Sequence, residues 1–245
     1  MENRKLAFMS IIFLLTLSMM LIAGCSKDNA KPVSSESGEA EIKSMSGKEL
    51  VKQNSATEKD QVLIIDVRSE EEYNAGHIPH AINIFIDEME GRFDEIEDYK
   101  DKPIILYCNT GNRSRKAAEI LASNGFKDVT NAQGVKEFEY DLVHYKDVRG
   151  AAFQKIIDED KDIILVDVRP EKQVKEEGMM EGAINVPFDA VEENLVKLPK
   201  DKTIALYCNT GTKSSEAAKQ LESLGYENVV NAIEGVKEYA FTLVK

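Results

Sequence analysis

Two of the three cysteines lie in nearly identical stretches of sequence, 100 residues apart. The first stretch, YCNTGNRS, covers residues 107–114, and the second, YCNTGTKS, covers residues 207–214. In each, the cysteine precedes a glycine, a cation (Arg113 or Lys213) and a serine. A thiol becomes a nucleophile when it is deprotonated, and nearby cations and backbone N–H groups favour the thiolate. The spacing therefore predicts reactive thiols at Cys108 and Cys208.

Two structural roles compete with this interpretation. The N-terminus, discussed below, predicts export, and exported proteins often pair their cysteines in disulfides. One disulfide between Cys108 and Cys208 is therefore an alternative. A free cysteine that ends a hydrophobic strand is also often buried and inert. Neither role requires the same glycine, cation and serine after both cysteines, so the duplicated frame favours thiol chemistry.

The elements around the two cysteines also repeat. Residues 62–84 are similar to residues 163–186, and residues 125–138 are similar to residues 225–239, with one inserted residue, Glu234. Each copy is about 100 residues long, an ordinary size for a small domain. The repeat predicts one domain over residues 45–146 and a second over residues 147–245.

Each copy reads as alternating strands and helices. Short apolar runs at residues 62–66 and 103–108 are typical of strands buried on both faces of a parallel sheet. A helix is expected between Ser114, the candidate N-cap, and Gly125, where the chain should leave the helix. This order predicts an α/β fold, in which each domain has a mainly parallel sheet with helices on both faces. Ligands bind such sheets beyond the carboxyl ends of the strands, where Cys108 and Cys208 lie.

The six residues from Cys108 to Arg113 must connect a buried strand to a helix. A glycine there permits a tight turn, with a positive φ at Gly111. Such a turn points several N–H groups inward, and the helix N-terminus and Arg113 add positive charge. We therefore expect a lowered pKa for the Cys108 thiol and an anion site formed by the loop. Its candidate binding residues are Asn109, Thr110, Gly111, Asn112 and Arg113, with Lys213 in the second copy.

Three motifs together resemble the rhodanese family of sulfurtransferases, over about residues 45–245. They are DVR at residues 66–68 and 167–169, GHIPHAINI at residues 76–84 with a divergent copy at residues 178–186, and the CNTGNRS loop. The resemblance implies two tandem rhodanese-like domains with catalytic cysteines at Cys108 and Cys208. It implies a persulfide cycle that takes sulfane sulfur from a small anion such as thiosulfate and passes it to cyanide or a thiol. Arg113 would hold the donor, and no cofactor is implied.

Loop length distinguishes this family from phosphatases that are similar in fold. Those enzymes have one more residue between cysteine and arginine, which accommodates a tetrahedral phosphate around the thiolate. Here four residues intervene, at positions 109–112. The shorter loop suits a single sulfur atom.

Other polar residues are interpreted as structural. Arg68 is expected to form an ion pair with Glu71 or Glu72 that fixes the strand end after Asp66. His77 is expected to be structural, as it mostly is in the family, and His80 and His144 are expected at the surface. The acidic run at residues 86–99 is interpreted as a solvated helix face. Its inward residues would be Ile86, Met89, Phe93 and Ile96. No metal-binding motif is present in the sequence.

Charge and the N-terminus indicate where the protein works. The net charge of −13, with scattered Lys and Arg, argues against a nucleic-acid partner. Residues 1–24 read as a signal peptide, and the stretch IAGC at residues 22–25 resembles the lipobox of bacterial lipoproteins. Lipid on Cys25 would anchor the protein to the extracytoplasmic face of the cell membrane, and polar residues 25–44 would form a flexible tether. An uncleaved membrane anchor is the alternative.

Two other functions remain open at this point. The chain could carry a persulfide to a partner without efficient turnover, or sense oxidants through a thiolate. The two copies also differ, because Lys213 replaces the arginine, and Met179 and Glu181 replace His77 and Pro79. An ammonium lacks the two-pronged grip of a guanidinium. We therefore expect Cys108 to perform most of the turnover.

Overall fold

The computed structural model describes residues 42–55 and 58–245. The predicted signal peptide, the lipid site at Cys25 and most of the tether lie outside these residues. The tether was expected to reach residue 44, but Lys43 and Ser44 belong to a strand, β1 (Lys43–Met45), that pairs with the first sheet. Within the described residues, no helix combines the length and the apolar character that crossing a membrane requires.

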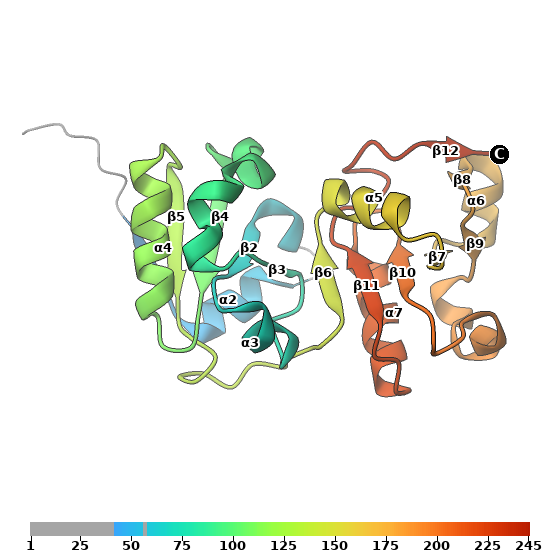
Figure 1. Cartoon of the computed structure of the whole chain (residues 1–245), viewed down its shortest axis with the longest axis horizontal. Coiled ribbons are helices and arrows are strands. Elements are labelled where there is room, and N and C mark those ends of the chain that lie inside the picture. Colours follow the sequence, from blue (N-terminus) through green and yellow to red (C-terminus); the bar gives the residue numbers. More distant parts are fainter. Residues whose placement is uncertain (1–41, 56–57) are drawn as a thin grey trace, which may run out of the picture. The chain divides into compact units, whose positions relative to one another are not determined.

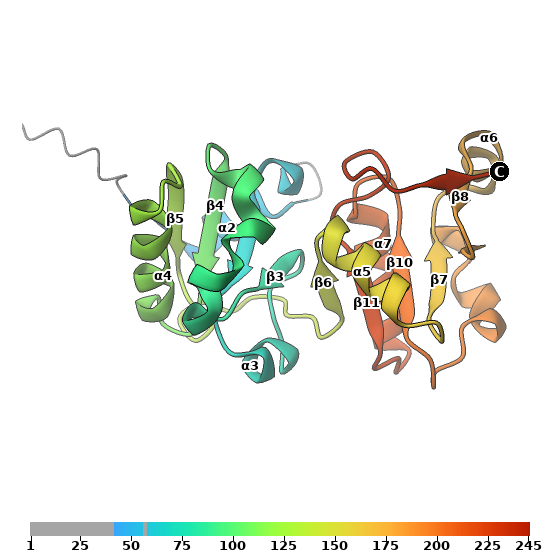
Figure 2. The same cartoon turned by 45° about the horizontal axis from the view of Figure 1, so that its top comes forward.

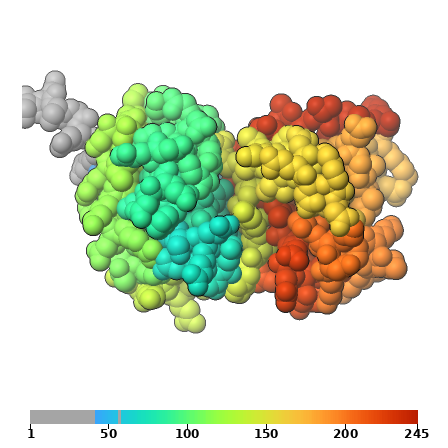
Figure 3. All heavy atoms as spheres, in the orientation of Figure 1, coloured from blue at the N-terminus to red at the C-terminus, as the bar shows by residue number. Residues whose placement is uncertain are grey.

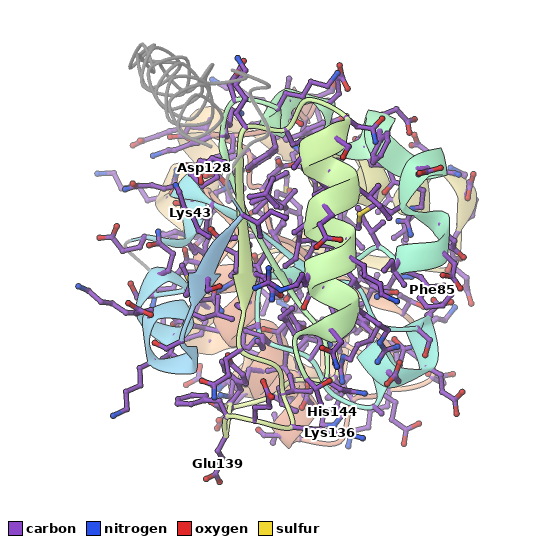
Figure 4. All side chains as sticks on the ribbon, turned by 90° about the vertical axis from the view of Figure 1, so that its left-hand side faces the viewer. Lys43, Phe85, Asp128, Lys136, Glu139 and His144 are labelled. Carbon is purple, nitrogen blue, oxygen red and sulfur yellow. The ribbon has the colours of Figure 1, made fainter. Side chains whose placement is uncertain are left out.

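The first domain is built on a five-stranded parallel sheet with the order β1-β5-β4-β2-β3 (Figure 1). At its edge, Lys43 of β1 and Asp128 of β5 lie side by side (Figure 4), and their ion pair measures 2.7 Å. This contact and the strand pairing tie β1 to the sheet. The other strands are β2 (Leu63–Asp66), β3 (Ala81–Asn83), β4 (Pro103–Tyr107) and β5 (Asp128–Ala132).

Apolar clusters fill both faces of this sheet, as the continuous hydrophobic runs predict. On one face, Leu63 and Ile65 pack with residues of η2 (Ile86–Tyr99) and α4 (Asn112–Ser123). On the other, Ile64 packs with Leu50 of α2 (Gly47–Gln53). Neighbouring residues of β2 thus point to opposite faces, which fixes its register. The short elements η1 (Lys59–Gln61) and α3 (Glu70–Asn74) complete the domain.

The second domain repeats this plan, with a five-stranded sheet in the order β6-β11-β10-β7-β9 (Figure 2). Phe153 of α5 (Gly150–Glu159) is buried on one face, and α7 (Thr212–Ser223) packs on the other. A small antiparallel pair, β8 (Met179–Met180) with β12 (Leu243–Val244), is added. The sheet strands are β6 (Lys146–Val148), β7 (Ile164–Asp167), β9 (Ile184–Asn185), β10 (Ile204–Tyr207) and β11 (Val229–Ala232). The remaining helical segments are α6 (Glu171–Glu177), η3 (Phe188–Ala190) and η4 (Glu192–Lys197).

The acidic run at residues 86–99 turns its apolar side chains inward as expected. Met89 and Ile96 are buried, and Ile86 and Phe93 pack against the same core. The run does not form one regular helix, however. It consists of 3₁₀ turns interrupted at Arg92, whose φ of −123° is not helical.

The prediction that Arg68 pairs with Glu71 or Glu72 is wrong. Its guanidinium binds both carboxylate oxygens of Asp66, at 2.6–3.0 Å, and the carbonyl of Gly76 at 2.7 Å. Because Arg68 and Asp66 are both buried, their charges must compensate each other within the domain. Glu71 and Glu72 are not needed for this.

The histidines differ in environment. His77 is fully buried and stacked on Tyr73 with 3.7 Å between ring centroids, a structural position. His80 was expected at the surface, but it is partly buried and its Nδ1 lies 2.9 Å from Asn54 Oδ1. Burial lowers the pKa of His80. His144 is exposed, as expected, and pairs with Glu222 at 2.9 Å.

Candidate active site

The first cysteine loop joins the carboxyl end of β4 to the start of α4. Cys108 follows Tyr107, the last residue of β4, and the helix begins at Asn112. Gly111 caps the helix with a φ of 75°, so the predicted positive φ is confirmed. Ser114 was expected as the N-cap but lies in the first helical turn. Its hydroxyl is 3.4 Å from the Cys108 sulfur, because the chain turns more tightly at the glycine than the N-cap assignment assumed.

Hydrogen-bond donors converge on the Cys108 sulfur. Burial, the largest single influence, raises the pKa of this thiol, whereas the hydroxyl and backbone N–H of Ser114 lower it. The N–H groups of Thr110 and Arg113 lower the pKa further, so the net shift of the Cys108 pKa is downward, as predicted. Such an arrangement stabilises a thiolate, and equally the anionic terminal sulfur of a persulfide. Cys108 and Cys208 are both free, so the disulfide alternative is wrong.

A second stretch of chain, residues 134–136, packs against this loop and forms hydrogen bonds with its backbone. Val135 N–H donates to the Cys108 carbonyl and Lys136 N–H donates to the Asn109 carbonyl, each at 3.0 Å. Gly134 lies so close that a Cβ there would come within 2.2 Å of the Asn109 oxygen. Sequence reasoning did not assign this supporting role. The signal was present, because the GVKE stretch that contains Gly134 recurs at Gly235.

Glu72 is the second residue that the sequence interpretation did not place in the site. Its carboxylate binds the Arg113 guanidinium in a bidentate ion pair, with N–O distances of 2.6 and 2.8 Å. It also accepts a hydrogen bond of 2.6 Å from Asn109 Nδ2. The Arg113 contact lowers the pKa of Glu72 to about 2, against the opposing effect of burial, and Asn109 adds to it. Glu72 therefore holds both ends of the loop.

The second loop has the same backbone but different side-chain contacts. Gly211 caps α7 with a φ of 75°, and the Ser214 hydroxyl lies 3.5 Å from the Cys208 sulfur. Lys213 pairs with Glu216 at 2.6 Å and lies over the Phe188 ring.

Gln173 occupies the position of Glu72 in this loop. It exchanges hydrogen bonds of 2.8 and 3.2 Å with the amide of Asn209. The neutral amide–amide pair replaces the ionic contacts of the first loop.

The remaining predicted loop residues are all at the site. Asn112 Nδ2 lies 3.4 Å from the Thr110 hydroxyl, next to the capping Gly111. A cleft of about 1180 Å³ is lined by residues of both domains, between the green surface of the first and the yellow surface of α5 (Figure 3). Neither cysteine lines it. Within residues 42–55 and 58–245, there is no cluster of His, Cys, Asp and Glu that could hold a metal ion.

Comparisons with known proteins agree with this geometry. Residues 48–139 and 151–241 each match the Rhodanese-like domain family. The chain is 40% identical over 73 residues to the thiosulfate sulfurtransferase PspE of Escherichia coli K12, a match that covers 30% of this chain and 70% of PspE.

Other similar proteins show that such domains occur in wider contexts. The tRNA uridine(34) hydroxylase of Photorhabdus laumondii is 33% identical over 85 residues, covering 33% of this chain and 24% of that protein. The chain thus spans only about a quarter of the hydroxylases that it matches. The crystal structure of a rhodanese-like domain protein from Staphylococcus aureus is 30% identical, with a TM-score of 0.36, and covers 42% of this chain and 97% of that one.

The family matches cover most of the chain in two consecutive segments, and each segment contains one cysteine loop at the end of a parallel strand. One of these relatives, PspE, is itself a thiosulfate sulfurtransferase. The chain belongs to the rhodanese family and consists, in this part, of two tandem rhodanese-like domains.

Proposed function

We propose that the chain is a sulfurtransferase that moves sulfane sulfur from a small anion such as thiosulfate to cyanide or a thiol, through a persulfide on Cys108. The observation that supports this most is the set of donors around the Cys108 sulfur, with the lowered pKa of its thiol. A thiolate at neutral pH can attack a sulfane sulfur, and the same donors stabilise the product.

The reaction has two steps. The Cys108 thiolate attacks the outer sulfur of thiosulfate, the S–S bond of the donor breaks, and sulfite leaves with the bonding electron pair. Cyanide then attacks the terminal sulfur of the persulfide, thiocyanate leaves, and the thiolate is restored. Neither step needs an external oxidant or reductant.

Arg113 is the proposed contact for the donor anion. A guanidinium has five N–H donors, and the ion pair with Glu72 uses two of them. The Arg113 side chain is one-third exposed, so its other donors can meet an anion that arrives from solvent. Lys213 is the corresponding cation beside Cys208.

Two observations favour the second candidate, a persulfide carrier with slow turnover. Cys108 is only 1% exposed, and Glu72 already neutralises the cation beside it. Both features oppose fast use of a free dianion. The carrier hypothesis predicts that Cys108 takes up sulfur once but releases it efficiently only to a protein or thiol partner.

Intact-mass analysis after incubation with thiosulfate tests both candidates. We expect an added mass of one sulfur that a thiol reductant removes, and that is lost in Cys108→Ser. Accurate mass separates one sulfur from two oxygens, the product of the oxidant-sensor alternative. Steady release of thiocyanate from cyanide supports the enzyme, and a single loading without it supports the carrier.

We also propose that the protein works at the extracytoplasmic face of the cell membrane, anchored by lipid on Cys25. This rests on the sequence IAGC alone. Labelling with a fatty-acid analogue should mark the wild-type chain but not Cys25→Ser. An unlabelled chain that begins at Met1 would contradict the anchor.

A further inference from the structure

A lysine of the first domain reaches the cysteine loop of the second. Lys59 Nζ donates to the backbone carbonyl of Thr210, in the second loop, and lies 3.5 Å from the carbonyl of Ile233. Its third partner is the carboxylate of Asp60. Lys59 is only 6% exposed. Lysine is almost never buried to this degree unless its ammonium group is paired.

The ammonium group has three N–H donors, and these three acceptors match them. Two of the acceptors, at Thr210 and Ile233, belong to the second domain. A buried ammonium without hydrogen bonds is strongly destabilising. Lys59 is therefore satisfied only while it touches the second loop.

The contact constrains the backbone of that loop. In a trans peptide, the carbonyl of Thr210 and the N–H of Gly211 point in opposite directions. A cation held on the carbonyl fixes the plane of this peptide at the cap of α7 and strengthens its dipole. It also brings a second cation, which is itself paired with Asp60, to a loop whose own cation, Lys213, is paired with Glu216.

The inserted residue of the second copy builds this arrangement. In the second domain, Ile233 precedes the insertion and its carbonyl lies against Gly211, where a Cβ would come within 2.2 Å of it. At the corresponding Gly111, the nearest neighbour is the side chain of Asn131 at 3.6 Å. The extra residue thus brings a carbonyl to the loop that Lys59 can bind.

The inserted residue, Glu234, also takes part in an ion-pair network that links the two domains. Glu234 binds the Arg149 guanidinium at 2.6 and 2.9 Å, and Arg149 binds Asp98 of the first domain at 2.7 and 2.9 Å. Burial of Arg149 is offset by these two carboxylates, which raise its pKa. This network holds the first domain, and with it Lys59, against the second loop.

We propose that Lys59 is a positioning residue of the second cysteine loop, so that the reactivity of Cys208 depends on the first domain. The first loop has no such dependence, because the hydrogen bonds described above for it come from Glu72, Val135 and Lys136 of its own domain. The proposal extends the proposed function to Cys208 but concerns thiol reactivity, which can be measured without sulfur transfer.

The test is site-specific alkylation of the full chain, followed peptide by peptide, so that Cys108 serves as the control within each molecule. In Lys59→Met we expect alkylation of Cys208 at neutral pH to be about threefold slower, with the rate at Cys108 unchanged. Lys59→Arg should recover most of the rate. Lys52→Met, at an exposed lysine of the same domain, is the matched control and should change neither rate.

An unchanged Cys208 rate in Lys59→Met overturns the proposal. An equal slowing of both cysteines also overturns it, since that would mark a general loss of structure. If Lys59→Met does not fold, Glu234→Gln weakens the Arg149 contact from the other side and should slow Cys208 selectively but less; no selective effect contradicts the proposal. Failure of thiosulfate loading at both cysteines would sink the proposed function and leave this result intact.

Discussion

The two cysteine loops share one backbone and differ in what their charged side chains contact. Gly111 and Gly211 have the same φ of 75°, and both cysteines accept a hydroxyl contact from the serine six residues later. In the first loop, Glu72 fixes the cation Arg113. In the second, where Gln173 stands at the position of Glu72, Lys213 turns away to Glu216.

The difference shows that the backbone turn of the loop and the orientation of its cation can vary independently. The glycine and the helix start suffice to form the turn, because they act on the backbone. The orientation of the cation needs a carboxylate from another element, α3. Two substitutions, at the positions of Glu72 and Arg113, therefore change how the loop can hold an anion without changing the fold.

The largest expected effect separates the two cysteines. Cys108→Ala should remove most thiosulfate turnover, by tenfold or more, whereas Cys208→Ala should keep most of it. The reason is the bidentate cation present only in the first loop, whose loss is equivalent to roughly 1.5–3 kcal/mol. Thiocyanate formation from thiosulfate and cyanide measures both. Activity that survives in Cys108→Ala would reverse the ranking.

The next effect tests the shared backbone support. Gly134→Ala places a methyl group 2.2 Å from the Asn109 carbonyl, and Gly235→Ala does the same against Asn209, at 2.1 Å from its carbonyl carbon. Each should lower the free energy of unfolding by about 1–3 kcal/mol. Only Gly134→Ala should also abolish most turnover, because it displaces the Cys108 loop. Equal activity in the two variants would contradict the ranking of the loops.

A gain of function sharpens the comparison further. In a Cys108→Ala background, Lys213→Arg combined with Gln173→Glu rebuilds the ion pair of the first loop beside Cys208. We expect about a tenfold rise in the residual turnover, and a smaller rise from Lys213→Arg alone, because a lone guanidinium is not held in place. If the single and double variants are equally active, the positioning role of the carboxylate is wrong.

The smallest effect concerns the stability that Glu72 adds. Its folded-state pKa of about 2 lies below the ordinary value of 4.5, so its contribution is complete above about pH 4.5 and is lost as the pH falls through about 2. Glu72→Gln should therefore be less stable than wild type by about 1 kcal/mol at neutral pH, as expected for a partly exposed pair. Urea unfolding at several pH values should show this difference shrinking toward pH 2. A constant difference would show that the ion pair is not its source.

Local features of the sequence were sufficient for the fold and the position of the loops. Apolar runs of strand length, the duplicated cysteine frame and the glycines at positions 111 and 125 are properties of neighbouring residues. The positive φ values of 75° and 90° at these glycines follow from local backbone sterics. A prediction based on such features needs no knowledge of distant contacts.

Predictions from neighbouring residues were wrong where more than one residue could take the same structural role. Ser114 was a reasonable N-cap by residue type, but the tight turn gave that position to Gly111 and directed the serine to the sulfur. Arg68 had Glu71 and Glu72 nearby in sequence, yet burial paired it with Asp66. In both cases the packing of the surrounding chain chose between the partners.

The sequence by itself determined two tandem α/β domains, each with a thiol at the end of a parallel strand, because these depend on patterns a few residues long. Only the tertiary structure decided which groups surround those thiols. Glu72 meets Arg113 across 41 residues of chain, and Lys59 meets Thr210 across 151. Such contacts depend on strand register and on how the two domains pack, which no local pattern of residues encodes.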